Sequence, residues 1–287
     1  ISHIDNNSFF FSLKKIFSNI KFIFIQNGTG IADLTYLERK KLSWHSDLFF
    51  SYSDKFSKIY SKFLKSKIYS IGSFKNNFLK IDKNIKRKKT IVFISQYRIS
   101  SSKVSERDII YTYNRKKFTL EKFFKAEKLL IPIIYKFCKK NGYKLVIAGS
   151  NLDYQLILKE KNFYEQILKK NIPNFEKKFF EYKKIKNEYS SYKLIDSSSL
   201  VVFVDSALGY QSLVRQNKTL ACSFRSQYVK NQNLNFGWPY KLANEGPFWI
   251  NNYNLNKLNI KLSNLLKMNK STWKKIYKKY DKNLIMY

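Results

Sequence analysis

Short apolar runs that alternate with longer helical segments constrain the fold of this chain more than any other feature. The runs are rich in β-branched and aromatic residues, and each interval between them leaves room for a helix. This alternation is typical of parallel sheets whose strands are joined by crossover helices. The expected strands are residues 21–25, 47–51, 67–71, 90–95, 143–148, 199–204 and 218–223. The sequence therefore predicts an α/β fold.

Two of the intervening segments carry a clear helical pattern. Residues 54–64 and 122–140 each place their apolar side chains on one helical face. Pro132 lies inside the second segment, where it predicts a kink or a helix start close by. Apolar residues at helical spacing also fill residues 256–287, which predicts a helical tail at the end of the chain.

A charged stretch with almost no apolar pattern, Lys80–Lys89, marks the expected domain boundary. We place a first domain at residues 1–84 and a second at residues 85–255, before the helical tail. The second holds enough strands and helices for one doubly wound domain. The first holds three expected strands, too few for a comparable domain. The sequence therefore predicts an incomplete N-terminal domain, whose missing part lies upstream.

Composition favours a folded, cytoplasmic protein. The chain has 287 residues, of which 44% are hydrophobic, so it can bury one large core or two ordinary ones. Cys138 and Cys222 each lie in an apolar run, which predicts buried thiols in a reducing compartment. The sequence has no apolar run of about 18 residues, so a membrane span is not predicted.

The net charge of +35 raises the question of an anionic partner. Only seven of the 55 basic residues are arginines, and Lys, Asn, Ile, Phe and Tyr are abundant. These residues have AT-rich codons, so a biased genome accounts for the charge without a nucleic-acid partner. The alternatives are attraction to an anionic membrane surface, which would place the protein peripherally at the inner membrane, or to a phosphorylated substrate.

The strongest local motif is residues 204–213, where an apolar strand ends at Asp205 and a helix begins within two residues. Free backbone N–H groups and the positive end of the helix dipole make such a start a site for phosphate. Ser206 could cap the helix or donate to a phosphate oxygen, and Gly209 leaves room for a ligand near the backbone. The alternative is an ordinary strand-to-helix turn with a capping serine.

Several blocks, taken in order, resemble a bacterial family of surface-carbohydrate or lipopolysaccharide biosynthesis proteins. The blocks are residues 23–28, 68–77, 92–97, 204–213, 236–239 and 246–249. That family is similar to GT-B glycosyltransferases and to UDP-N-acetylglucosamine 2-epimerases. The resemblance implies two Rossmann-like domains of GT-B type, with a nucleotide-sugar donor bound mainly by the C-terminal domain.

The resemblance also assigns roles within the 204–213 motif. It places the donor phosphate on the block that contains Asp205, Ser206, Ala207, Leu208 and Gly209. A glutamate that holds the ribose is expected a few positions further on. Gln211 stands there instead, and its uncharged amide oxygen predicts weaker ribose binding or lost activity.

Polar residues at two other strand ends are expected to face the same cleft. Ser95 and Gln96 follow one strand, and Gly149 and Ser150 follow the next. Ligands of open α/β sheets bind beyond the carboxyl ends of the strands. The alternative for each residue is an ordinary polar strand end.

Two arginines are candidates to neutralise the donor phosphates. Arg98 and Arg225 each lie just past an expected strand. The planar guanidinium fork suits phosphate because it can donate two parallel hydrogen bonds. Solvated surface charge is the alternative.

In the N-terminal part, a glycine-containing loop follows the first expected strand. Its residues Gln26, Asn27, Gly28 and Thr29 could contact the acceptor or donor sugar, or could form a tight turn. Asp33 and His45 are the candidate catalytic bases, although a structural role is the alternative for His45 and the base could lie upstream.

The aromatic and proline residues at 238–239 and 247–249 could line a sugar-binding wall or pack into the core. No metal site is predicted, because the chain has two histidines and no clustered acidic pair. The co-substrate is a nucleotide sugar, and no other cofactor is expected.

The sequence thus predicts a metal-independent glycosyltransferase that moves a sugar from a nucleotide-activated donor to a surface polysaccharide or lipopolysaccharide acceptor, carried as a glycan or a lipid-linked glycan. A nucleotide-sugar epimerase or hydrolase of the same fold stays open, as does a catalytically degenerate binding partner. A Gly209→Val change is predicted to damage donor binding more than folding.

Overall fold

A computed structural model describes residues 2–3, 13, 16–26, 28, 44–82, 84–187 and 189–283. The chain divides into two compact units. Unit 1 comprises Ile1–Ile81, Gly237–Lys241 and Lys278–Tyr287, and unit 2 comprises Asp82–Phe236 and Leu242–Tyr277. The first division between the units therefore falls within the charged stretch that marked the expected boundary.

Unit 1 contains a parallel sheet in the order β1-β2-β3-β4. Its strands are β1 (Ser2–His3), β2 (Ile23–Ile25), β3 (Trp44–Ser51) and β4 (Leu64–Ser70). Helix α3 (Asp54–Tyr60) connects β3 to β4 and begins after Ser53, whose side chain accepts a hydrogen bond from the Phe56 N–H. A short helix, α4 (Phe74–Phe78), follows β4. The amphipathic α3 packs on the sheet, as the 4.8 Å separation of the Phe49 and Tyr60 rings shows.

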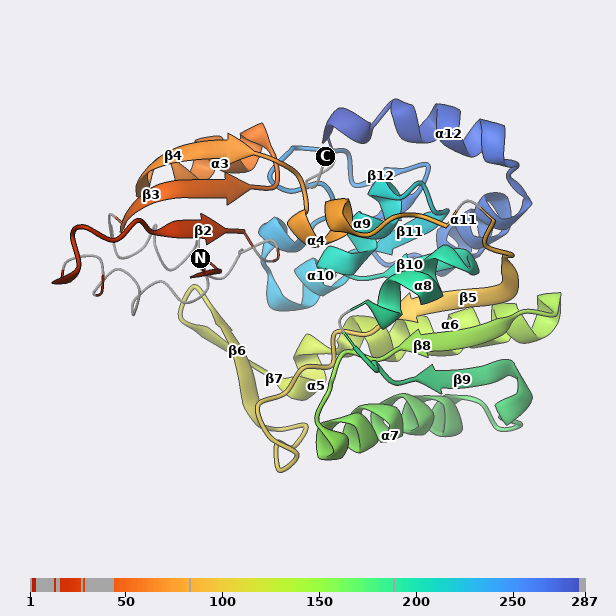
Figure 1. Ribbon diagram of the computed structural model, residues 1–287. Helices are drawn as coiled ribbons and strands as arrows, with labels where there is room; N and C mark the ends of the chain where they lie inside the picture. Colours follow the sequence, from red (N-terminus) through yellow and green to blue (C-terminus); the bar gives the residue numbers. More distant parts are fainter. Residues whose placement is uncertain are drawn as a thin grey trace. The chain divides into compact units, whose positions relative to one another are not determined.

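Unit 2 is built on a seven-stranded sheet in the order β12-β13-β11-β10-β5-β8-β9 (Figure 1). The strands are β5 (Lys88–Ile94), β8 (Lys144–Ala148), β9 (Phe180–Lys183), β10 (Ser198–Phe203), β11 (Thr219–Cys222), β12 (Glu245–Gly246) and β13 (Trp249–Ile250). All neighbours are parallel except β12 and β13. The chain runs outward from β5 to β9 and then returns to β10 on the other side of β5. This reversal point is where doubly wound sheets bind their ligands.

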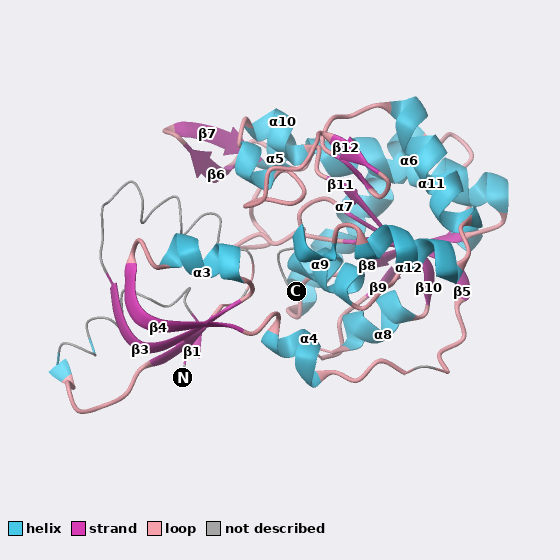
Figure 2. Cartoon of the chain, turned by 90° about the horizontal axis from the view of Figure 1, so that it is seen from above, coloured by secondary structure: helices cyan, strands magenta, loops and turns pink. Residues whose placement is uncertain are grey.

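Helices cover the sheet of unit 2 (Figure 2). The helices that follow β5 in the chain are α5 (Leu120–Phe123), α6 (Lys125–Asn141), α7 (Tyr154–Asn171), α8 (Ser190–Asp196), α9 (Ala207–Val214), α10 (Arg225–Val229), α11 (Leu255–Lys267) and α12 (Lys270–Lys278). Helix α6 packs on β5, β8 and α7, whereas α8 and α9 pack on β10. An antiparallel hairpin, β6 (Ile109–Tyr113) and β7 (Lys116–Thr119), lies between β5 and α5 in the sequence. Short 3-10 turns occupy Lys177–Phe179, Gln232–Leu234 and Asp281–Asn283.

Burial on both faces explains the apolar sequence of the central strands of unit 2. Side chains of both faces of β5 and β10 are buried, including Ile91, Val92, Phe93, Val201 and Val202. A strand covered on both sides carries no polar alternation. The core extends to the end of the chain, because Leu258, Leu262, Leu265 and Trp273 are buried as well. Helix α11 and most of α12 thus belong to unit 2 instead of forming a separate tail.

The predicted α/β class with parallel sheets is confirmed. Each of the seven expected strands corresponds to a strand of the structure, and helix α6 contains Pro132 in its interior. Cys138 and Cys222 are free and buried, and burial raises the pKa of both thiols. None of the described helices combines the length and apolar character needed to cross a membrane.

Candidate functional site

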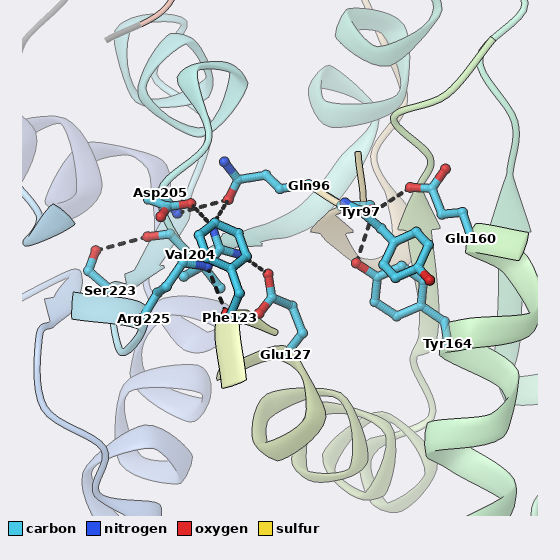
Figure 3. Close-up of polar contacts among 11 residues, drawn as sticks. Gln96, Tyr97, Phe123, Glu127, Glu160, Tyr164, Val204, Asp205, Ser223 and Arg225 are labelled. Carbon is cyan, nitrogen blue, oxygen red and sulfur yellow. Dashed lines mark hydrogen bonds and ion pairs between the residues drawn. The ribbon is translucent and has the colours of Figure 1, made fainter. Parts of the chain in front are cut away.

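A polar cluster lies where β5 and β10 end, at the reversal point of the unit 2 sheet (Figure 3). Gln96 follows β5, and Asp205 follows β10. The side-chain oxygen of Gln96 accepts hydrogen bonds from the Asp205 backbone N–H at 3.2 Å and from Arg225 Nη1 at 3.3 Å. Gln96 therefore ties the two strand ends together.

Arg225, the first residue of α10, lies in the interior, with its side chain 2% exposed. Its Nη1 donates to Asp205 Oδ1 at 2.5 Å, its Nε donates to the Phe123 carbonyl at 3.2 Å, and its Nη2 pairs with Glu127. The Phe123 ring centre lies 4.2 Å from the guanidinium carbon. An internal ion pair thus takes the place of the phosphate contact that the sequence suggested for Arg225.

Glu127, in the first turn of α6, is the partner that sequence reasoning missed. Its side chain is 1% exposed, and its Oε2 has no hydrogen-bond partner in the described part of the chain. Burial raises the pKa of this carboxyl to about 7, although Arg225 lowers it. Glu127 therefore changes its protonation state near neutral pH.

A second buried carboxylate, Glu160 of α7, accepts hydrogen bonds from residues that follow β5 and β8 (Figure 3). It accepts hydrogen bonds from Ser95 Oγ, Ser150 N and Oγ, Asn151 Nδ2 and Tyr182 Oη. Ser95 also accepts from Tyr164 Oη at 2.8 Å. Ser95 and Ser150, which were expected to face a ligand, are thus engaged by Glu160 and position the strand ends.

Two glycines of the expected site are required by packing. A Cβ on Gly149 would lie 2.4 Å from Tyr182 Oη, where β8 and β9 approach closely. A Cβ on Gly209 would lie 2.1 Å from Cγ of Phe203, a fully buried ring. No side-chain atom can occupy such a position. The structure therefore corrects the reason given for Gly209: the absent side chain makes room for Phe203.

The start of α9 presents unused donors. Ser206 precedes the helix without capping it through its side chain, and Ser206, Ala207 and Leu208 are half-buried. Within the described residues, the N–H groups of these three residues make no hydrogen bond. Such groups at a helix start, together with the helix dipole, attract an anion. Arg98 is exposed just past β5, the neighbour of β10, and its side chain has no ion-pair partner among the described residues.

Gln211, in the second turn of α9, points its amide oxygen at α8. This oxygen accepts a hydrogen bond from the buried Tyr192 hydroxyl at 2.8 Å. An amide oxygen has two lone pairs. Tyr192 therefore takes one of the positions from which Gln211 was expected to accept a ribose hydroxyl.

A groove of about 460 Å³ runs along α8. It extends from the carboxyl ends of β8 and β9, at Ala148 and Lys183, to the amino ends of β5 and β10, at Lys88 and Ser197. Ile85, Ala148, Ile185 and Leu194 give it apolar walls, and Ser190 and Ser191 line it as well. It is also lined by Lys86, Lys88, Lys183, Lys184, Lys186 and Lys193. No acidic side chain lines it in the described part of the chain. Sequence reasoning missed this groove, because β9 was not among the expected strands.

In unit 1, the loop after β2 is held to the residue after β3. Gln26 accepts from the Tyr52 N–H at 2.9 Å and donates to the Gly28 carbonyl at 3.1 Å. The Gly28 N–H donates to Tyr52 Oη at 2.6 Å, and its φ of +86° favours glycine. Both ends of the Gln26 amide are thus used within unit 1. Asn27, Thr29 and Asp33 lie outside the described residues.

His45 lies near the amino end of β3, where it is exposed. Gln26 and Gly28 follow the carboxyl end of the parallel strand β2, and Ile23 of β2 aligns with Leu48 of β3. The structure therefore places His45 at the opposite edge of the sheet from Gln26. Within the described residues, no group of three or more His, Cys, Asp or Glu side chains could hold a metal ion.

The aromatic residues near 238 and 249 pack against protein. Phe248 and Trp249 are buried in unit 2, and a Cβ on Gly246 would meet the Trp249 ring at 2.0 Å. In unit 1 the Trp238 ring lies 5.5 Å from Phe56. Of the two roles weighed for these residues, the structure supports burial of a loop for Phe248 and Trp249.

A family model described as a putative O-antigen biosynthesis protein matches residues 23–287. No curated protein matches the sequence.

Solved structures with a similar fold include two sugar-phosphate synthases. Sucrose-phosphate synthase from Thermosynechococcus elongatus has a TM-score of 0.53 at 10% identity, over 99% of this chain and 68% of its own. Trehalose 6-phosphate synthase from Burkholderia multivorans has a TM-score of 0.50 at 10% identity, over 95% and 64%. S. aureus TarM has a TM-score of 0.49 at 15% identity, over 96% and 50%. The chain thus spans only part of each. At these identities, the similarity to the first two shows the fold alone.

Proposed function

Since this chain belongs to the family of putative O-antigen biosynthesis proteins, we propose that it is a glycosyltransferase that moves a sugar from a nucleotide-activated donor to a bacterial surface polysaccharide or lipopolysaccharide. The observation that carries the proposal is the open start of α9 at the reversal point of the unit 2 sheet, with the exposed Arg98 on the neighbouring strand end. A helix start with free N–H groups at this point suits a diphosphate.

We infer the position of the donor from the chemistry of each region. The N–H groups of Ser206, Ala207 and Leu208 would hold the diphosphate, and Arg98 would neutralise it. The lysine-lined groove beside β9 and α8 has apolar walls and hydroxyls suited to a base. Gln211, one turn into α9, would then meet the ribose. Cys138 and Cys222 are buried free thiols, which fits a cytoplasmic enzyme, and its basic surface would suit a peripheral position on an anionic membrane.

The proposed reaction needs a base and a stabilised leaving group. The base removes the proton of the acceptor hydroxyl, whose oxygen forms the new bond to the sugar as the bond to the nucleotide diphosphate breaks. Arg98 and the N–H groups at the start of α9 would stabilise the charge on the departing diphosphate, in place of a metal ion. Asp33 is the candidate base that we retain, because His45 lies at the other edge of the unit 1 sheet.

Replacing Arg98 with alanine tests the phosphate site. We expect the Kd for UDP-N-acetylglucosamine, measured by calorimetry, to rise about tenfold, because a charge-assisted hydrogen bond to the diphosphate is lost. Arg107→Ala is the matched control, since Arg107 is also exposed and lies in the segment between β5 and β6. An equal change in both variants would show that the protein's overall charge, and not a contact from Arg98, determines affinity.

Gln211→Glu tests the ribose assignment. A carboxylate can keep the hydrogen bond from Tyr192 and accept a second one, so we expect tighter binding of a ribonucleotide donor by up to about tenfold. Affinity for the 2′-deoxyribose analogue, measured in the same titration, should change less. Equal changes for both donors would place the ribose away from Gln211.

A product assay separates the proposed transfer from an epimerase or hydrolase of the same fold. A transferase releases nucleotide only when an acceptor glycan is present. Turnover of the donor without an acceptor would therefore contradict the proposed function.

A further inference from the structure

Three charged side chains from distant parts of the sequence converge behind the start of α9 (Figure 3). Asp205 follows β10, Arg225 begins α10, and Glu127 lies in the first turn of α6. The Arg225 guanidinium bridges the two carboxylates, at 2.5 Å from Asp205 Oδ1, and pairs with Glu127 on its other arm. Their side chains are 9%, 2% and 1% exposed, in the order Asp205, Arg225, Glu127.

The cluster fixes the backbone that leads into α9. Asp205 directly precedes Ser206, the residue before the helix, and its N–H donates to Gln96. Arg225 holds both the Gln96 oxygen and the Asp205 carboxylate. Ser223 Oγ, at the end of β11, donates to the Val204 carbonyl at 2.9 Å and secures the same turn from the other side. Without Arg225, the Asp205 carboxylate would repel an anion at the helix start.

We propose that Arg225 and Glu127 are positioning residues of the donor site, which hold Asp205 and Gln96 in place and set the net charge behind the start of α9. This inference rests on the proposed function, because it assumes that the donor diphosphate binds at that start. Neither residue touches the diphosphate, since both are buried.

The charge of the cluster depends on the proton of Glu127. With Glu127 protonated, Arg225 and an ionised Asp205 cancel, and with Glu127 ionised the cluster carries one negative charge. The unpartnered Glu127 Oε2 and the pKa of about 7 place this change near neutral pH.

The other titratable groups that face the cluster keep their charge in this range. Tyr164 of α7 and Tyr111 of β6 both interact with it, and burial raises the pKa of both phenols, so they stay neutral. Burial lowers the pKa of Arg225, but the neighbouring carboxylates Asp205 and Glu127 together raise it above its ordinary value, so Arg225 stays charged. Glu127 is thus the member whose titration should reach the donor site.

The test is the pH dependence of nucleotide-sugar binding to the full chain. Calorimetry with UDP-N-acetylglucosamine is suitable, because its doubly esterified diphosphate does not titrate near pH 7. We expect the wild-type Kd to rise about fivefold between about pH 6 and about pH 8, the effect of one unit charge several ångströms away in a partly solvated site. Glu127→Gln, which keeps the side-chain shape, should bind with the same Kd across this range.

A second buried ion pair provides the control. Arg215 and Asp196 lie 2.5 Å apart, with side chains 2% and 6% exposed, and Asp196 ends the helix that leads into the amino end of β10. Asp196→Asn should lower stability yet keep the wild-type pH dependence of binding. If Glu127→Gln shows the same pH dependence as the wild type, the inference is overturned while donor binding stands. If the wild-type protein binds no nucleotide sugar at any pH, the proposed function fails and the inference falls with it.

Discussion

An Arg225→Leu variant is expected to lose about 3 to 5 kcal/mol of unfolding free energy, because two buried carboxylates lose their shared cation. Arg225 pairs with Glu127 and Asp205, and its Nε also donates to the Phe123 carbonyl. Leucine keeps part of the packing against the Phe123 and Phe124 rings, over which the guanidinium lies, but offers no hydrogen bond. Urea denaturation at neutral pH measures the loss.

The loss should depend on pH in a direction that Glu127 determines. Its folded-state pKa of about 7 lies above the ordinary value of 4.5. The stability that this proton contributes is fully present below pH 4.5 and is lost as the pH rises through about 7. Without Arg225, the ionised form of Glu127 is even less favourable in the folded protein, because Arg225 lowers the pKa of this carboxyl. The Arg225→Leu variant should therefore lose less stability relative to wild type at acidic pH than at pH 8.

Lys139→Leu is the matched control for this prediction. Lys139 and Glu176 form an ion pair of 2.5 Å, but their side chains are 39% and 35% exposed. An exposed pair in water contributes far less to stability than a buried one whose partner is removed. Equal losses in the two variants would show that burial does not determine what the Arg225 cluster contributes.

The sequence predicts the central strands well because a strand that is buried on both faces consists of apolar residues. β5 and β10 are covered on both faces, so their sequences are continuous apolar runs. The edge strand β9 was not predicted, because it is only partly buried and its sequence is not a continuous apolar run. Its four residues, Phe180–Lys183, include a glutamate and a lysine, as the half-exposed edge of a sheet allows. The β6–β7 hairpin likewise includes the exposed polar residues Thr112, Lys116 and Lys117.

For the candidate site, the sequence locates backbone features and fails on side-chain pairings. The apolar run ending at Asp205 predicts the strand-to-helix turn, because strand, turn and helix are all local. Arg225 meets Glu127 across 98 residues, and Ser95 meets Glu160 across 65. Spacing along the chain carries no information about such contacts. The sequence therefore does not distinguish the buried Arg225 from the exposed Arg98.

The glycine at position 209 shows the same limit in steric form. In the sequence, a glycine next to a helix start suggests room for a ligand. A neighbouring aromatic ring can require a glycine at the same position, and the sequence does not distinguish the two cases. In the structure a Cβ at this position would lie within 2.5 Å of three atoms of the Phe203 ring. Because Phe203 lies on β10 and is fully buried, it has nowhere to move.

Gly209→Val is accordingly expected to destabilise unit 2 by about 3 kcal/mol or more, since inserting one carbon into a packed core already costs about 1 to 3 kcal/mol and valine adds three. Gly209→Ala, the smaller change, should lose less. In a Phe203→Leu background the alanine should be tolerated better, and the difference between the two backgrounds measures the clash. Thermal and urea denaturation of the wild type, the three single variants and the double variant gives these values.

Gly142→Ala separates this clash from an ordinary loss of glycine. Gly142 ends α6 with φ +68° and has open space around its Cβ position, so alanine there should cost about 1 kcal/mol through backbone strain alone, whatever residue stands at 203. A Gly209→Ala protein that kept its full stability and lost nucleotide-sugar affinity would reverse the conclusion. Ligand access, and not Phe203, would then explain the glycine. If stability falls and the remaining folded protein binds as before, the start of α9 holds its ligand through Ser206, Ala207 and Leu208, with Gly209 serving only to seat the helix on β10.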